Sequence, residues 1–330
     1  MRRREFITLL TGVAAGWPPP TEAQQPKRRR IGVLWPYAED DPDSQSRIAS
    51  LRQALRDLGW TEARNLRLDY RWEASADDPD RIRRYAMELV ALAPDVIVAG
   101  SGGIAVELKR TSRTVPIVFP TANDPVGVGL VESLQRPGGN ATGFSGFESG
   151  QTDKFLELLK QIAPNVTRVA VIRNPARRGG NTNFGAIQAA AVPLGLEVSP
   201  VDLRDVDSIE RGIAVFAGAQ NGGLVVPPAA LATTHRGVII KLAARYRLPA
   251  VYPLRVFVTD GGLISYGPVT TDLYPGVARY IDRILKGEKP GDLPVQFPTR
   301  FELFINHNTA RALGLNVPPR LLALADEVIE

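Results

Sequence analysis

The feature that most constrains the fold of this chain is an alternation of strand-like and helix-like segments that occurs twice. Short apolar segments rich in β-branched residues alternate with segments whose apolar residues recur at helical spacing. The expected strands of the first copy begin at residues 31, 66, 95 and 116, and those of the second at residues 168, 196, 223 and 249. The two sets are offset by a nearly constant interval of about 130 residues. We therefore predict an α/β fold of two similar doubly wound parallel-sheet lobes joined by a hinge.

The composition excludes several kinds of site. The 330 residues are 44% apolar and 23% charged, which is typical of a folded globular protein rather than a disordered one. The chain has no cysteine, so it contains no disulfide, thiolate metal site or thiol nucleophile. Its two histidines, His235 and His307, are too far apart in sequence to give metal-ligand spacing. We expect no metal site and no cofactor.

The first 23 residues have the order of parts found in an export signal. Residues 3–7 read Arg-Arg-Glu-Phe-Ile, which resembles the twin-arginine motif. The apolar stretch Ile7–Trp17 is shorter than the roughly 20 residues that span a bilayer, and Thr21-Glu22-Ala23 offers small residues where a signal peptidase reads them. We predict a twin-arginine signal peptide over residues 1–23, cleavage after Ala23 and a periplasmic protein. No later apolar segment is long enough to predict a membrane-spanning helix.

Charged runs in the sequence do not indicate a nucleic-acid or calcium site. The short basic run at residues 27–30 is interpreted as a solvated tail. The acidic stretch at residues 39–43 lacks a calcium-loop pattern and is interpreted as a solvated loop that caps the following helix. A transcription regulator with this architecture would carry a DNA-binding module at its N-terminus, where this chain has its leader. We expect no nucleic-acid partner.

A set of short motifs spread over nearly the whole chain resembles the ABC-transporter substrate-binding family that includes tryptophan-binding members. One of these motifs is Arg-Pro-Gly-Gly-Asn-Ala-Thr-Gly at residues 136–143, and it is the combination of motifs that is specific. The other matching segments are 116–119, 124–126, 129–131, 174–175, 262–267, 284–287, 298–303, 312–315 and 325–330. The resemblance implies a type I periplasmic binding protein-like fold, three hinge crossings and ligand capture between the lobes. Known ligands of related members include aromatic amino acids.

The resemblance also implies how the chain is divided between the lobes. Lobe one is expected to comprise residues 30–143 plus 264–295, and lobe two residues 144–263 plus 296–330. The return of the chain to lobe one at residue 264 rests on the family alone, because the periodicity does not indicate it.

Ligands of parallel sheets bind at the carboxyl ends of the strands, so the candidate site residues are those that follow strands. Ser101, Gly102 and Gly103 end a strand and open a helix, where free backbone N–H groups suit a carboxylate, although a plain β–α turn fits equally. Trp35 and Tyr37 end the first strand. Their rings are placed either to stack on a flat ligand or to shield the edge of the lobe.

Five further residues are candidates by the same argument. The Asp124 carboxylate is placed either to pair with a ligand ammonium or to cap a helix start. Asn174 and Pro175 follow the first strand of lobe two and form either a polar contact or a turn. Tyr252 ends the last strand of lobe two, and Tyr266 lies at an expected crossing, where it is either ligand wall or hinge packing.

No catalytic residue is predicted. The sequence lacks a Gly-x-Ser-x-Gly elbow, a Walker loop and a Gly-x-Gly-x-x-Gly after a strand, although two-carboxylate chemistry is left open. We expect a monomeric binding protein that captures a small carboxylated molecule, such as an amino acid, by hinge closure and delivers it to a membrane ABC permease. The alternatives are a periplasmic sensor partner of a membrane receptor and an enzyme on the same fold.

Overall fold

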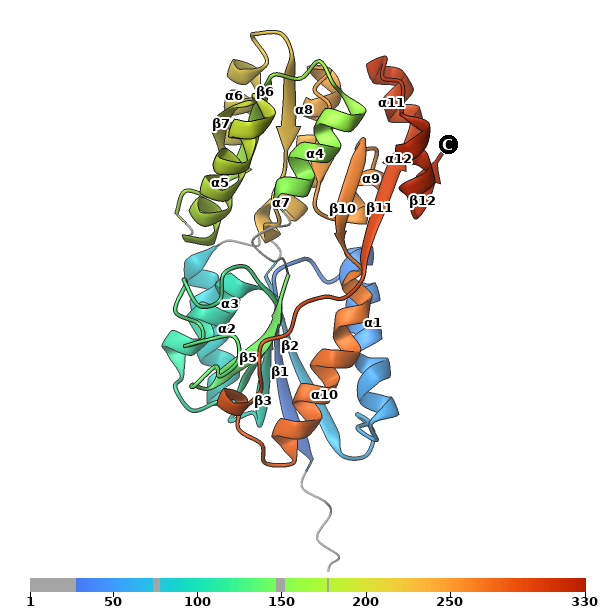
Figure 1. The fold of residues 1–330 in the computed structure, drawn as a ribbon. Helices are drawn as coiled ribbons and strands as arrows, with labels where there is room; N and C mark the ends of the chain where they lie inside the picture. Colours follow the sequence, from blue (N-terminus) through green and yellow to red (C-terminus); the bar gives the residue numbers. More distant parts are fainter. Residues whose placement is uncertain (1–27, 74–77, 147–151, 177) are drawn as a thin grey trace, which may run out of the picture.

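The computed structural model describes residues 28–73, 78–146, 152–176 and 178–330. Two α/β lobes are stacked end to end, and the chain passes between them more than once (Figure 1). The predicted signal peptide and its cleavage site lie outside the described residues. Within the described part of the chain, no helix is long and apolar enough to cross a membrane.

The first lobe is built on a parallel five-stranded sheet of order β2-β1-β3-β4-β5. Helices α1 and α10 cover one face, where Ile31 and Val33 are fully buried, and helices α2 and α3 cover the other, where Leu34 and Ile97 are fully buried. The strands are β1 (Arg29–Trp35), β2 (Leu66–Trp72), β3 (Val96–Ala99), β4 (Ile117–Ala122) and β5 (Ala141–Ser145). The helices are α1 (Pro42–Asp57), α2 (Pro79–Ala91), α3 (Gly102–Thr111) and α10 (Tyr274–Leu285).

The helices of the first lobe begin where side chains satisfy their free N–H groups. Asp41 accepts a hydrogen bond from the Ser44 N–H at 2.9 Å, and Pro42 occupies the first turn of α1. Asp41 of the acidic stretch therefore caps the following helix, as predicted. Asp78 caps α2 in the same way.

The second lobe is built on a seven-stranded sheet of order β12-β11-β10-β9-β8-β6-β7. Helices α4, α5 and α12 pack on one face of this sheet and helices α6 to α9 on the other. The strands are β6 (Arg168–Arg173), β7 (Glu197–Asp202), β8 (Gly222–Val225), β9 (Ala250–Tyr252), β10 (Ile264–Pro268), β11 (Phe301–Asn306) and β12 (Glu327–Ile329). The α-helices are α4 (Thr152–Ile162), α5 (Arg178–Ala191), α6 (Val206–Phe216), α7 (Ala230–Thr234), α8 (Arg236–Arg245), α9 (Arg255–Thr259), α11 (His307–Leu313) and α12 (Pro319–Leu324). The 3₁₀ turns of the chain are η2 (Val192–Leu194), η3 (Thr270–Leu273) and η4 (Pro290–Asp292).

The two sheets share one topology. The order β7-β6-β8-β9-β10 in the second lobe repeats the order β2-β1-β3-β4-β5 of the first, with every pair parallel. The second sheet is then extended by β11, which runs antiparallel to β10, and by β12, which runs parallel to β11. The prediction of two similar parallel-sheet lobes is confirmed, and the antiparallel extension is an addition to it.

The expected lobe boundaries need a correction at two strands. Residues 264–268 form β10, which pairs with β9 and β11 and therefore belongs to the second sheet, not to lobe one. Residues 144 and 145 belong to β5 and hence to the first sheet. Both segments are strands because they are buried and paired, and the crossings lie just beyond their ends.

Two of the crossings run side by side. One leads from β10 to α10, and the other leads from α10 back to β11 (Figure 1). The Val269 N–H donates to the Arg300 carbonyl at 3.1 Å, and the Arg300 guanidinium lies 3.1 Å from the Asp272 carboxylate. The third passage leads from β5 to α4.

Candidate functional site

The loops that follow the strands of both sheets meet at the boundary between the lobes. Asn123, directly after β4, donates from Nδ2 to the carbonyl of Pro228, which follows β8, at 3.0 Å. Asp41, in the loop after β1, lies 3.1 Å from Arg236 at the start of α8. Because both pairs connect strand-end loops of opposite lobes, the carboxyl ends of the two sheets face each other. This boundary is the candidate site.

Tyr37 lies at this boundary and is almost fully buried, with 9% of its surface exposed. Its ring faces the Arg47 guanidinium, 5.6 Å from the ring centroid, and its hydroxyl interacts with Thr233 on α7 of the other lobe. Burial raises the pKa of the Tyr37 hydroxyl, and the nearby Arg47 partly opposes that effect. Tyr37 therefore remains a neutral phenol that connects a buried ion pair of lobe one with a hydroxyl of lobe two.

The ion pair beneath Tyr37 is buried in lobe one. Arg47 lies 2.5 Å from Asp43, one turn earlier on α1, and its side chain is 6% exposed. Burial alone would lower the pKa of Arg47, but the charge of Asp43, the hydroxyls of Tyr37 and Tyr274 and the hydrogen bond to Asp43 together outweigh it and raise that pKa. The Arg47 side chain also bonds to Tyr274 at the start of α10. Arg47 is thus a fixed cation that orients two tyrosines near the boundary.

Arg236 bridges two acidic groups. Its Nε lies 2.7 Å from Asp260 of the same lobe, and its Nη2 lies 3.1 Å from Asp41 of the opposite lobe. The Arg236 and Asp41 side chains are 20% and 16% exposed. Because the pair is partly shielded from water, its electrostatic attraction helps to hold the two lobes together.

The predicted site residues at the end of β3 lie beside the boundary. The Ser101 hydroxyl accepts from the Ile104 N–H at 3.4 Å and so caps α3. A Cβ on Gly102 would lie 3.1 Å from the Ala122 side chain, so glycine lets the start of α3 approach the end of β4 closely. Gly103 occupies the first turn of α3 and is partly exposed. These residues are therefore close neighbours of Asn123, which contacts the other lobe.

Asp124 is a turn residue in this structure. Its backbone has a φ of 49°, in the left-handed region, and its Oδ1 accepts from the Gly127 N–H at 3.0 Å. The hydrogen bond closes a turn, and no helix begins directly after Asp124 in the described part of the chain, so the predicted cap of a helix start is not found there. The neighbouring Asn123, which was not among the predicted residues, reaches the other lobe instead.

Trp35 and Tyr252 are core residues. The fully buried Trp35 donates from its indole N–H to the Ser44 hydroxyl at 3.1 Å, and its ring lies 6.1 Å from that of Tyr274. Tyr252 is 1% exposed and stacks on Phe257 at 5.0 Å, and burial raises the pKa of its hydroxyl. These contacts account for both aromatic rings by packing inside their own lobes.

Asn174 and Pro175 form a turn at the end of β6. The Asn174 side-chain oxygen accepts from the Ala176 N–H at 2.9 Å, and the Pro175 carbonyl accepts from Asn181 at 3.2 Å. Tyr266, on β10, stacks on Phe301 at 5.6 Å next to the paired crossings. It lines a groove whose other lining residues also belong to lobe two.

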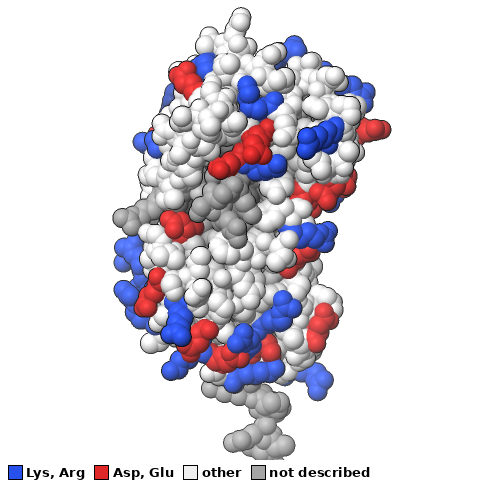
Figure 2. Space-filling model, in the orientation of Figure 1, with Lys and Arg blue, Asp and Glu red and all other residues white. Residues whose placement is uncertain are grey.

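The surface around the boundary carries charges of both signs. On the face shown in Figure 2, basic and acidic side chains are interspersed over both lobes. Among the described residues, no three His, Cys, Asp or Glu side chains gather closely enough to hold a metal ion. The chemistry available at the boundary is therefore hydrogen bonding and aromatic contact, from Tyr37, Ser101, Asn123 and Thr233.

Known structures define the class of this fold. The chain superimposes on a conserved domain protein from Vibrio cholerae with a TM-score of 0.85 at 26% identity, over 92% of this chain and 100% of the other. A protein from Streptococcus pneumoniae in complex with L-Trp gives the same score and coverage at 24% identity. A ligand-free, open substrate-binding protein from Clostridium difficile gives a TM-score of 0.67 at 24% identity, over 92% and 99% of the two chains. The fold is that of the two-lobed periplasmic binding proteins.

Sequence comparison then identifies the family. The model of the family described as ABC transporter substrate binding protein matches residues 38–329, so the chain belongs to that family. A curated relative, the tyrosine-binding protein of Clostridioides difficile, is 26% identical over 289 residues, which are 88% of this chain and 82% of the relative.

Proposed function

We propose that this protein captures an aromatic amino acid between its two lobes and presents it to a membrane ABC permease. The observation that carries the proposal is the meeting of strand-end loops across the boundary, through Asn123 with Pro228 and Asp41 with Arg236. A molecule held there would contact the carboxyl ends of both sheets at once, where open α/β sheets bind ligands.

The ligand class rests on relatives and on local chemistry together. One relative is named for tyrosine, and one structural neighbour is bound to L-Trp. In this chain, the N-terminus of α3 at Ser101 to Gly103 offers N–H groups for a carboxylate, and Asn123 offers a hydrogen-bonding amide beside it. Tyr37 lies at the same boundary, where its buried ring packs on Arg47 and its hydroxyl reaches Thr233 of the other lobe.

Hinge closure is the proposed mechanism. A ligand that contacts both lobes binds best when they are close together, so it shifts the population toward the closed arrangement. The higher TM-score with the L-Trp complex than with the ligand-free open relative, 0.85 against 0.67, supports a closed arrangement of this chain. Small-angle scattering should show a smaller radius of gyration when ligand is added, and an unchanged profile would contradict closure.

The direct test is calorimetric titration of the purified protein with L-tyrosine, L-tryptophan and L-phenylalanine, with L-alanine and a sugar as comparison ligands. We expect one saturable site for an aromatic amino acid, and at 100 times its Kd a stabilisation of about 2.7 kcal/mol in thermal unfolding. Mass spectrometry should recover the ligand unchanged, because binding rather than turnover is proposed. Absence of binding across the aromatic set would overturn the ligand class, and consumption of the ligand would favour an enzyme.

The proposed location is the periplasm, after export through the leader at residues 1–23. The protein would then act as a carrier for an importer rather than as a sensor partner. Deletion of the gene should abolish uptake of the labelled amino acid if the importer role is correct. Retained uptake, together with a lost response to that amino acid, would favour the sensor.

A further inference from the structure

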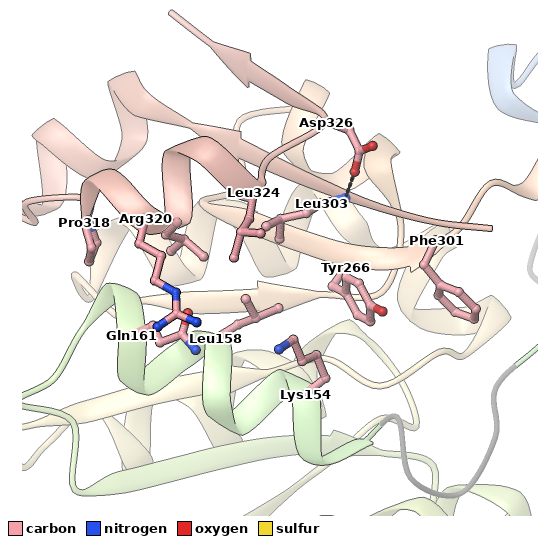
Figure 3. A pocket seen from close by; sticks show the side chains of 11 residues that line it. Lys154, Leu158, Gln161, Tyr266, Phe301, Leu303, Pro318, Arg320, Leu324 and Asp326 are labelled. Carbon is pink, nitrogen blue, oxygen red and sulfur yellow. Dashed lines mark hydrogen bonds between the residues drawn. The ribbon is translucent and has the colours of Figure 1, made fainter.

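A groove lies within lobe two, and all of the residues that line it belong to that lobe. It has a volume of about 550 Å³ and runs between α4 and α12 over strands β10 and β11 (Figure 3). Its floor is apolar and well packed, since the side chains of Leu158, Leu303 and Leu321 are between 1% and 7% exposed. At its rim, Leu324 leaves 61% of its surface exposed to water.

The two cations of this groove come from opposite walls. Lys154 projects from α4 and Arg320 from α12, and both reach over the apolar floor (Figure 3). Within the described part of the chain, Arg320 takes part in no hydrogen bond or ion pair, and Lys154 pairs only with Glu157, at 3.1 Å and on the exposed surface. An exposed ion pair of this kind contributes little to folding stability, so Lys154 is able to change partner.

The acidic group of the groove is already engaged. The Asp326 carboxylate accepts from the Leu303 N–H at 2.7 Å, at the edge of the groove away from Arg320 (Figure 3). Asp326 keeps its negative charge at that edge, so the two cations leave the lining with one net positive charge beside the apolar floor. An occupant that matches this surface has an apolar body and one anionic head group.

We propose that this groove binds a small amphipathic anion, such as a medium-chain carboxylate, at a site separate from the boundary between the lobes. The head group would lie between Arg320 and Lys154, and the apolar body would cover Leu303 and Leu324. The proposal stands on the groove alone and does not depend on which ligand the boundary binds.

The groove also adjoins the paired crossings. Tyr266 and Phe301, which line it, stack on each other at 5.6 Å, and each lies within three residues of the hydrogen bond that joins Val269 to Arg300. An occupant of the groove would therefore contact the base of the hinge. Its binding is expected to alter affinity at the boundary modestly and reciprocally.

The test uses the fluorescent anion 1-anilinonaphthalene-8-sulfonate as the probe and octanoate as its competitor. We expect one saturable binding site for the probe. Octanoate should displace the probe from this site, whereas L-tyrosine and L-tryptophan should not. The double variant Lys154→Gln, Arg320→Gln should weaken probe binding at least fivefold, because it removes both charges without altering the floor. The matched control Arg110→Gln changes a side chain that is 75% exposed on α3 of the other lobe and should bind as the parent does.

Three results would overturn the proposal. They are the absence of a saturable probe site, unchanged probe affinity in the double variant, and displacement of the probe by the aromatic amino acids. Melting temperatures of the variants will show that a loss of probe binding does not come from unfolding, since both substituted side chains are largely on the surface. If the probe does not bind the groove, calorimetry can still detect amino-acid binding at the boundary. The two hypotheses are therefore tested separately.

Discussion

Arg236 of lobe two and Asp41 of lobe one form an ion pair across the boundary between the lobes, with 3.1 Å between Nη2 and Oδ2. Asp260 holds the same guanidinium from its own lobe at 2.7 Å. Under the proposed hinge closure, Asp260 would hold Arg236 in a direction that suits Asp41 before the lobes meet. This preorganisation lowers the entropy that the cross-lobe contact would otherwise cost.

We expect Arg236→Gln to weaken ligand affinity by about fivefold, because a partly buried ion pair that forms on closure contributes about 1 kcal/mol. The loss should shrink at high ionic strength, where the parent pair is screened. Titrations at low and high salt will measure both effects. Asp260→Asn is the comparison variant, since it keeps the contact between Arg236 and Asp41 but weakens the contact that orients Arg236, so its loss of affinity should be smaller. Equal affinities of parent and Arg236→Gln at low salt would show that the pair does not favour closure.

Asn123 and Asp124 are adjacent but should respond differently to substitution. Asn123→Ala removes the hydrogen bond to Pro228 of the other lobe, so ligand affinity should fall several-fold while the free energy of unfolding without ligand changes little. Asp124→Ala removes the hydrogen bond to the Gly127 N–H and leaves alanine at a positive φ, so stability should fall by about 1–2 kcal/mol. Urea unfolding and ligand titration of both variants will separate the roles. The reverse pattern would assign ligand recognition to Asp124.

The buried pair Asp43–Arg47 should be sensitive to loss of one partner. Asp43→Ala leaves the Arg47 charge without its main partner in a buried site, and we expect a loss of about 3 kcal/mol of folding stability. The double variant Asp43→Ala, Arg47→Met should recover most of that loss, because it removes the buried charge as well. Denaturant unfolding of the single and double variants gives the comparison. No recovery in the double variant would mean that the contacts of Arg47 with Tyr37 and Tyr274 matter more than its charge.

His235 makes stability depend on pH in a defined direction. Burial lowers the pKa of its imidazole below the ordinary value of 6.5, so the unfolded chain takes up a proton at a higher pH than the folded one does. The contribution is fully present above pH 6.5 and is lost as the pH falls through the lowered pKa of the folded state. His235→Gln should therefore reduce the loss of stability between about pH 7 and pH 5. Urea unfolding across this range provides the measurement, and parallel pH profiles for parent and variant would refute the assignment.

The sequence predicted the two sheets because buried parallel strands read as continuous apolar runs, which are hard to mistake when helices alternate with them. It did not predict which sheet β10 joins. That choice depends on pairing with β9 and β11, and a strand carries no local signal for its partners. The sequence did not predict the antiparallel direction of β11 for the same reason.

The sequence located the strand ends but not the side chains that reach across the boundary. Trp35 and Tyr37 are two residues apart, yet Trp35 packs in the core and only Tyr37 interacts with the other lobe. Asn123 makes the contact with Pro228 while Asp124 next to it has a positive φ and closes a turn, and no residue pattern reveals that angle. Arg236 lies within a basic and polar helix start, where nothing distinguishes it from a solvated arginine until Asp41 is seen beside it.

The position of α10 affects the order in which the lobes can be completed during synthesis. Val277 and Ile281 of this helix are fully buried against the first sheet, although all five strands of that sheet precede residue 146. A nascent chain that ends before residue 274 would therefore expose the apolar face of the first sheet to water. The lobe made first cannot be finished until nearly the whole chain has emerged, and during that interval it needs protection from aggregation.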